Sequence, residues 1–503
     1  MNFGSIDWFI VGAYIVLAFG AGLVASRHIK GVSDFLVAGR KLRVHLAIAS
    51  LVGTELGLVT VMFMAEEGFR NGLAALIIGV IWGAAYVVVG TTGIIVQRVR
   101  RLRLLTITEF FEVRFSRGVR LLAALLLVIA GTLGMGVFLK AGGVFVVRFT
   151  NIPEAYLNHT MTALVLVVLA YTVLGGMVSV VITDYVQFIV LAVSMVLATA
   201  FVFTGVGFGN LFDGAERIAE AGGKGLNPFT HPGYGWAFIL YMLIFNIAGC
   251  TLWQPVAQRT LAVDNPDANK TLFRTTSMMF FGRAFFPVLW GVAAAVYFSG
   301  ATVDNSLAAM PDLLARLLPT VVCGLLAAGM FAALMSTYDS YLLAWAGVIV
   351  QDLVAPCVRR PLSDRARVLL VRLFVLVIGA VMLLFGIWYQ LKDSAYRYLL
   401  DACTIYYAGG LAVIVAGLYW KRATTFGAYL GFLMGAILPA GYIAEDLLSG
   451  GASRTFADLC SSNMRGFLSF LLGFAGVLIG SLIPVGAPRE LVYPDRNEST
   501  EGF

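Results

Sequence analysis

The sequence predicts an all-α polytopic membrane protein with about thirteen transmembrane helices. Of its 503 residues, 60% are hydrophobic and only 13% are charged, and its mean hydropathy is +0.88. A soluble chain of this length could not cover so much apolar surface with so few charges. Apolar runs of about 20 residues, the length that crosses a bilayer, recur from one end of the chain to the other.

The apolar runs divide the chain into thirteen expected spans, joined by short polar loops. No segment is long enough for a separate soluble domain, so we expect residues 1–503 to form a single membrane domain. The start of the chain lacks the basic region and cleavage site of a secretory signal, so the first span is expected to be retained. The expected spans are 6–26, 45–65, 72–97, 120–147, 160–180, 184–208, 234–257, 276–300, 319–350, 368–391, 396–419, 424–445 and 465–486.

The basic residues orient these spans. With the N-terminus outside, the cytoplasmic loops and C-terminal tail hold 23 of the 35 Lys and Arg residues, and the outer loops hold nine. The positive-inside rule therefore favours an outer N-terminus and a cytoplasmic C-terminus in the inner cell membrane. Because the net charge of +7 comes from these short loops, it does not indicate a nucleic-acid partner. The five cysteines and four histidines follow no metal-binding pattern.

Two expected helices contain interruptions. Span 45–65 has Gly53 and Gly57 on either side of an acid, Glu55. Span 234–257 has Gly249 and Pro255 around Trp253 and Gln254. Interrupted helices in matching positions of two halves indicate a transporter binding site, because unwound carbonyls can replace the hydration shell of a cation. The alternative is that these residues only kink the two helices.

Acidic and hydroxyl side chains also fall within the expected spans or at their edges. An ionised acid at mid-membrane costs at least about 2.5–3.5 kcal/mol, so each needs a partner or a wet cavity. The acids in or at the edges of spans are Glu55, Asp184, Asp339 and Asp401. In the ninth span, Ala333, Ser336 and Thr337 share one helix face, and Ser336, Asp339 and Ser340 repeat the spacing. Small, hard cations take such oxygen ligands, although Ser and Thr in membrane helices often bond only to their own backbone.

Five motifs in order resemble the sodium:solute symporter family. They are DFLVAGR at 34–40, YTVLGGMVSVVITDYVQ at 171–187, QRTLA at 258–262, AALMSTYDS at 332–340 and GLYWKRATTFGAYLGFLMG at 417–435. The resemblance implies a leucine-transporter-type fold with two inverted five-helix repeats. It places helix one at about 6–26, the repeats at about 45–208 and 234–419, accessory helices at about 424–486 and a short tail at 487–503.

The resemblance also implies sodium ligands. The family's usual site maps to the carbonyls of Gly53, Leu56 and Ala333 and the hydroxyls of Ser336 and Thr337. A second site, found in some members, maps to Asp184, Ser336, Asp339 and Ser340. Asp339 stands where those members have a Ser, so it either strengthens cation binding or pairs with a protein group.

The residues favour a small carboxylate or amino-acid-like solute. Sugar-carrying members place an Asn near Trp253 and a Glu near Gly79, and neither is present here. Arg283 can grip a carboxylate with two hydrogen bonds, or it pairs with a helix acid or reaches the cytoplasmic face. The residues expected around the solute are Glu55, Thr60, Trp253, Gln254 and Arg283.

These features together predict a sodium-coupled symporter that imports a small organic solute by alternating access, with sodium, the solute and lipid as partners and no obligate protein partner. One alternative is a proton-coupled carrier in which Glu55 or Asp339 titrates. A sugar or polyol symporter and a membrane sensor are further alternatives. An enzyme is disfavoured, because the sequence has no HExxH motif and no histidine near the intramembrane acids.

Overall fold

The computed structural model describes residues 3–26, 32–173, 176–221, 226–299, 305–389, 394–449, 455–483, 485 and 488–493. Within these residues the chain forms helices joined by short connections, and the one strand-like contact is an isolated parallel bridge between Leu42 and Val263. The predicted all-α class is confirmed.

Twelve helical stretches in the described residues are long and apolar enough to cross a membrane. One of them, Leu58–Thr92, contains two helices joined at Gly72, whose φ of 62° ends the first helix. The shorter helix Val44–Glu55 precedes it and forms the first half of the interrupted second span. Counted in this way, the crossing elements correspond to the thirteen expected spans.

The crossing helices follow the expected order. They are α1 (Ser5–Ser26), α3 (Val44–Glu55) with α4 (Leu58–Asn71), α5 (Leu76–Thr92), α8 (Arg117–Phe149), α9 (Leu157–Thr172), α10 (Met177–Val206), α12 (Gly235–Leu252) with α13 (Gln254–Ala262), α14 (Ala268–Tyr297), α16 (Val322–Val348), α17 (Asp364–Trp388), α18 (Ala395–Tyr419), α19 (Thr425–Ser449) and α21 (Ser462–Leu482). The remaining α-helices are α2 (Val32–Val37), α6 (Val96–Arg101), α7 (Glu109–Arg114), α11 (Phe208–Ala221), α15 (Ala309–Leu317) and α20 (Thr455–Leu459).

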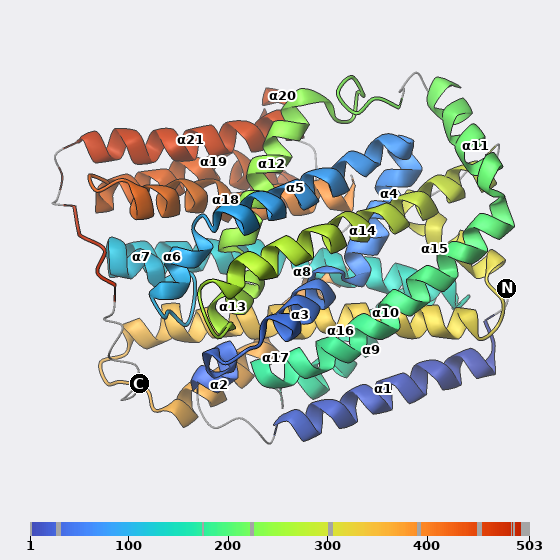
Figure 1. Cartoon of the computed structure of the whole chain (residues 1–503), viewed down its shortest axis with the longest axis horizontal. Helices are drawn as coiled ribbons and strands as arrows, with labels where there is room; N and C mark the ends of the chain where they lie inside the picture. Colours follow the sequence, from blue (N-terminus) through green and yellow to red (C-terminus); the bar gives the residue numbers. More distant parts are fainter. Residues whose placement is uncertain are drawn as a thin grey trace.

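The connections show the inverted arrangement of the two five-helix sets. In the first set, α6 and α7 join the second helix, α5, to the third, α8. In the second set, α15 occupies the corresponding place between α14 and α16. Figure 1 shows α6 and α7 at the end of the bundle where α21 finishes and α15 at the opposite end, where α1 starts. The opposite placement is what an inverted repeat requires, while the residue boundaries of the repeats stay a prediction.

Burial separates core helices from peripheral ones. In α16 and α18, 89% of the apolar window is buried inside the protein, compared with 28% in α1 and α17. The helices α19 and α21 pack against each other and against α18. Since α16 carries the predicted cation ligands, these ligands lie in the most enclosed part of the bundle.

Candidate cation and solute site

The first interrupted helix breaks between its two predicted glycines. Leu56 (φ −86°, ψ 56°) and Gly57 (φ −75°, ψ 159°) leave the helical conformation, and α4 begins at the next residue. The Thr60 hydroxyl donates to the carbonyl of Glu55 at 3.1 Å, which satisfies one of the acceptors at the end of α3. The break therefore has a local polar partner and is more than a kink.

The second interrupted helix breaks at a single residue. Trp253 (φ −67°, ψ 118°) separates α12 from α13, and its side chain is 5% exposed. Pro255 lies in the first turn of α13, where a missing N–H group leaves no hydrogen bond unmade. Both predicted interruptions are therefore present in the structure.

The first break faces the Thr337 hydroxyl of α16, while the neighbouring Ser336 hydroxyl donates to Asp184. The Thr337 hydroxyl lies 2.8 Å from the Thr54 carbonyl and 3.0 Å from the Ala333 carbonyl, as hydrogen-bond donor to either. A β-carbon at Gly57 would lie 2.2 Å from the Thr337 Oγ1, so only glycine permits this approach. The predicted cation ligands of α3 and α16 thus lie side by side, and the Thr54 carbonyl, which the sequence did not single out, joins them.

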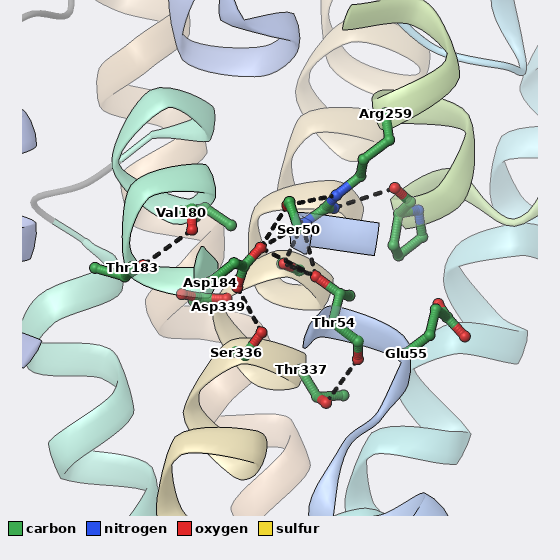
Figure 2. A network of polar contacts seen from close by, with 12 residues as sticks. Ser50, Thr54, Glu55, Val180, Thr183, Asp184, Arg259, Ser336, Thr337 and Asp339 are labelled. Atoms are coloured by element: carbon green, nitrogen blue, oxygen red, sulfur yellow. Dashed lines mark hydrogen bonds and ion pairs between the residues drawn. The ribbon is translucent and has the colours of Figure 1, made fainter. Parts of the chain in front are cut away.

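A buried ion pair lies beside these ligands (Figure 2). The Arg259 guanidinium comes from α13, and its Nη2 lies 3.0 Å from a carboxylate oxygen of Asp184 on α10. Both side chains have no exposed surface. The same nitrogen also donates to the hydroxyls of Ser50, Thr54 and Ser340, at 2.9, 2.7 and 2.7 Å respectively.

The ion pair includes Asp184, and Arg259 also contacts Ser340, so it lies at the second predicted cation site. Arg259 occupies the space between Asp184 and Ser340, and Ser336 donates to the other Asp184 oxygen. Asp339 accepts a hydrogen bond from Tyr171. A positive group of the protein therefore stands where the sequence placed a second sodium. The expected span 234–257 ends before Arg259, but α13 continues to Ala262 and buries this residue.

A cavity of about 110 Å³ opens on the other side of the first break. Gly57 and Thr337 line it, so the candidate cation ligands and the cavity share a wall. Aromatic side chains contribute a large share of the remaining lining and come from the break at Trp253 and from α4, α5, α8, α12, α14, α16 and α18. Four of the five residues expected around the solute line this cavity, namely Glu55, Thr60, Trp253 and Arg283.

The fifth expected solute residue, Gln254, lies outside the cavity lining. Its side chain has no exposed surface, and its Oε1 accepts a hydrogen bond from the Ile107 N–H group at 3.0 Å. Gln254 is the first residue of α13, and this position turns its side chain toward the segment before α7. Its role is to tie α13 to that segment, and the expectation of a solute contact is corrected.

Arg283 faces Glu55 across the cavity. Its Nη1 lies 3.4 Å from a Glu55 oxygen, and its guanidinium lies over the rings of Trp82 and Phe280 at 4.0 and 4.3 Å. The sequence left open that Arg283 pairs with an acid on another helix, and Glu55 is this acid. Both side chains keep about a tenth of their surface exposed, 10% for Arg283 and 12% for Glu55.

A helical bundle with two interrupted helices around an enclosed cavity defines a secondary carrier. Comparison with known proteins agrees. The chain belongs to the sodium:solute symporter family, whose model matches residues 35–435. The family resemblance noted in the sequence is confirmed, and the chain is a sodium-coupled solute symporter rather than an enzyme.

Named relatives cover most of the chain. The sodium/glucose cotransporter of Vibrio parahaemolyticus is 26% identical over 462 residues, covering 85% of this chain and 83% of that protein. The osmoregulated proline transporter OpuE of Bacillus subtilis is 25% identical over 448 residues, covering 85% and 86%. A solved Na⁺-coupled sialic acid symporter has the same fold, with a TM-score of 0.80 at 20% identity, covering 98% of this chain and 100% of that one.

Proposed function

We propose that one sodium ion binds between the first break and α16 and drives import of a small carboxylate or amino-acid-like solute through the adjoining cavity. The observation that carries this proposal is the Thr337 hydroxyl, which meets the Thr54 and Ala333 carbonyls where the helix is interrupted. Hydroxyl and carbonyl oxygens are ligands that sodium accepts. The ligands are Gly53, Leu56, Ala333, Ser336 and Thr337, with the Thr54 carbonyl beside them.

In the proposed orientation, the chain spans the inner membrane with its N-terminus outside and its C-terminus in the cytoplasm. Figure 1 places the start of α1 and the end of α21 at opposite ends of the bundle, in agreement with an odd number of crossings. The end where α21 finishes carries α6, whose last turn contains Arg98, Arg100 and Arg101. This charge distribution follows the positive-inside rule.

Sodium entry from outside supplies the driving force. One elementary charge that crosses a potential of 100 mV gains about 2.3 kcal/mol, to which the sodium gradient adds. Because Gly57 and Thr337 line both the candidate cation site and the cavity, sodium binding would order the wall against which the solute packs. The two sites are thereby coupled through shared residues.

Sodium-dependent thermal stabilisation of the purified protein tests the cation site. Wild type is compared with Thr337→Ala in sodium or potassium chloride at fixed pH. Loss of one oxygen partner of a charged group is worth about 1.5–3 kcal/mol, so Thr337→Ala should require about 10- to 100-fold more sodium.

Thr276→Ala is the matched control, because the Thr276 hydroxyl also donates to the carbonyl four residues earlier but lies outside the cavity lining. The control should respond to sodium like wild type. An unchanged sodium response in Thr337→Ala would reject the site. Stabilisation that follows pH and ignores sodium would identify the proton-coupled alternative.

A further inference from the structure

Two charged side chains, Glu55 and Arg283, line the cavity and form an ion pair with a long separation. The Glu55 oxygens lie 3.4 Å from the Arg283 Nη1 and 3.4 Å from the Tyr341 hydroxyl. Charge-assisted hydrogen bonds in proteins are about 2.7–2.9 Å long. The pair of Arg465 and Asp401, buried elsewhere in the bundle, reaches 2.7 Å. The Glu55–Arg283 pair is therefore long for an ion pair and retains capacity for other partners.

The guanidinium of Arg283 is held by rings and has few hydrogen bonds. It lies over Trp82 and Phe280, and its buried Nε has no hydrogen-bond partner among the described residues. Stacking fixes the plane of an Arg side chain while leaving its N–H groups available at the edge. A planar, preorganised donor of this kind suits a carboxylate.

The rest of the cavity lining is more apolar than polar. Ten of its 24 lining residues are aromatic. The Thr60 hydroxyl donates to the Glu55 carbonyl, and the Asn246 amide donates to the Met242 carbonyl. A polyol needs a partner for each hydroxyl, and an unpaired buried hydroxyl is costly. The lining therefore suits a solute with one charged end and an apolar body.

The apolar body has a defined place. The Trp253 ring makes edge-on contacts with Tyr341 at 5.5 Å and Tyr407 at 5.7 Å, and Phe245 packs on Tyr407 at 5.0 Å. All four side chains line the cavity. Engineered apolar cavities of about 150 Å³ hold benzene, so the cavity of about 110 Å³ suits a single small side chain.

We propose that the solute is a zwitterion with an apolar side chain, such as an apolar α-amino acid, whose carboxylate contacts Arg283 and whose ammonium contacts Glu55. This inference rests on the proposed function and narrows its solute class. A plain carboxylate on Arg283 would lie beside the Glu55 carboxylate, and a plain amine on Glu55 would lie beside the guanidinium. Only a solute with both charges replaces the internal ion pair with two favourable contacts.

Ligand-induced thermal stabilisation in sodium tests the proposal. The probes are the twenty standard amino acids, and each one that binds is compared with its deaminated acid and its decarboxylated amine. For valine these are 3-methylbutanoate and 2-methylpropylamine, and for leucine they are 4-methylpentanoate and 3-methylbutylamine. Each missing charge removes a charge-assisted contact, so both analogues should bind about 10- to 100-fold more weakly than the amino acid.

Two variants test which protein residue contacts each charged group of the solute. Glu55→Gln should weaken binding of the amino acid and bring the deaminated acid to equal or greater affinity, while Arg283→Gln should abolish binding of both. Glu66→Gln is the control, because Glu66 bonds to Arg70 and Ser306 outside the cavity lining. Glu66→Gln should leave unchanged the preference for the amino acid over its deaminated and decarboxylated analogues. Retained stabilisation by sodium alone shows that each variant is folded.

Several results would overturn the inference. They are the absence of binding by every amino acid, stronger binding by glucose, or a deaminated acid that equals its amino acid in wild type. Because sodium stabilisation is measured without solute, these outcomes leave the cation site standing. Loss of the sodium response in wild type would instead reject the proposed function itself.

Discussion

Removal of Arg259 is expected to destabilise the whole bundle. Arg259 and Asp184 are fully buried and 3.0 Å apart. Replacing one member of such a pair leaves an uncompensated charge in the interior, which costs about 3–5 kcal/mol. We therefore expect Arg259→Met and Asp184→Asn each to lower the free energy of unfolding by about this amount. Unfolding of the purified protein in mixed micelles with sodium dodecyl sulfate measures it.

The double variant provides the decisive comparison. If the cost comes from the orphaned charge, Arg259→Met combined with Asp184→Asn should be no less stable than either single variant. A double variant whose loss equals the sum of the two single losses would show that the residues act independently and would refute the reasoning.

A second buried pair separates stability from sodium coupling. Arg465 and Asp401 are 3% and 2% exposed and join α21 to α18. The single and double variants of Arg465 and Asp401 should show the same pattern of unfolding free energies as those of Arg259 and Asp184. The sodium response should remain that of wild type for this pair, whereas it should weaken for variants of Arg259, which donates to the Thr54 hydroxyl beside the cation ligands. Equal effects of both pairs on the sodium response would show that Arg259 acts only on stability.

Two further substitutions probe features of the backbone. Gly57→Ala should weaken the sodium response at least tenfold, since the added methyl group would lie 2.2 Å from the Thr337 hydroxyl; a wild-type sodium titration of this variant would contradict the close approach. Asp7→Ala should lower the unfolding free energy by about 0.5–2 kcal/mol, because the buried Asp7 carboxylate accepts from the backbone N–H groups of Val321 and Gly324 at the start of α16. Unfolding in the same micelles measures the loss, and an unchanged midpoint would rule out this cap.

The sequence predicted the class of fold and the two interruptions because both depend on local properties. Apolar runs reveal the spans; Gly57 lies in the first break, and Gly53 and Pro255 lie in the helical turns next to the two breaks. The partner of Asp184 depends instead on tertiary packing, because Arg259 is 75 positions away in the chain. The rule that a buried acid needs a partner was a usable signal, and Arg259 lies only two residues beyond the expected span 234–257.

Side-chain direction at the breaks was harder to predict. Gln254 and Trp253 are neighbours in the sequence, yet only Trp253 lines the cavity. The change of backbone direction at Trp253 decides which of the two faces inward, and a linear sequence does not record that angle. Arg283 and Glu55 were both expected near the solute, but their contact with each other follows from the packing of α14 against α3.

The bridge between Leu42 and Val263 has a mechanical consequence. The Leu42 N–H group donates to the Ala262 carbonyl at 3.0 Å, and the Asp264 N–H group donates to the Leu42 carbonyl at 3.1 Å. Together with the hydrogen bond from Arg259 to Ser50, these contacts join α3 to α13. The breaks at Leu56–Gly57 and Trp253 end α3 and precede α13, and Glu55 and Trp253 both line the cavity. A molecule bound against Glu55 and Trp253 would therefore touch both of the interrupted segments that these contacts join.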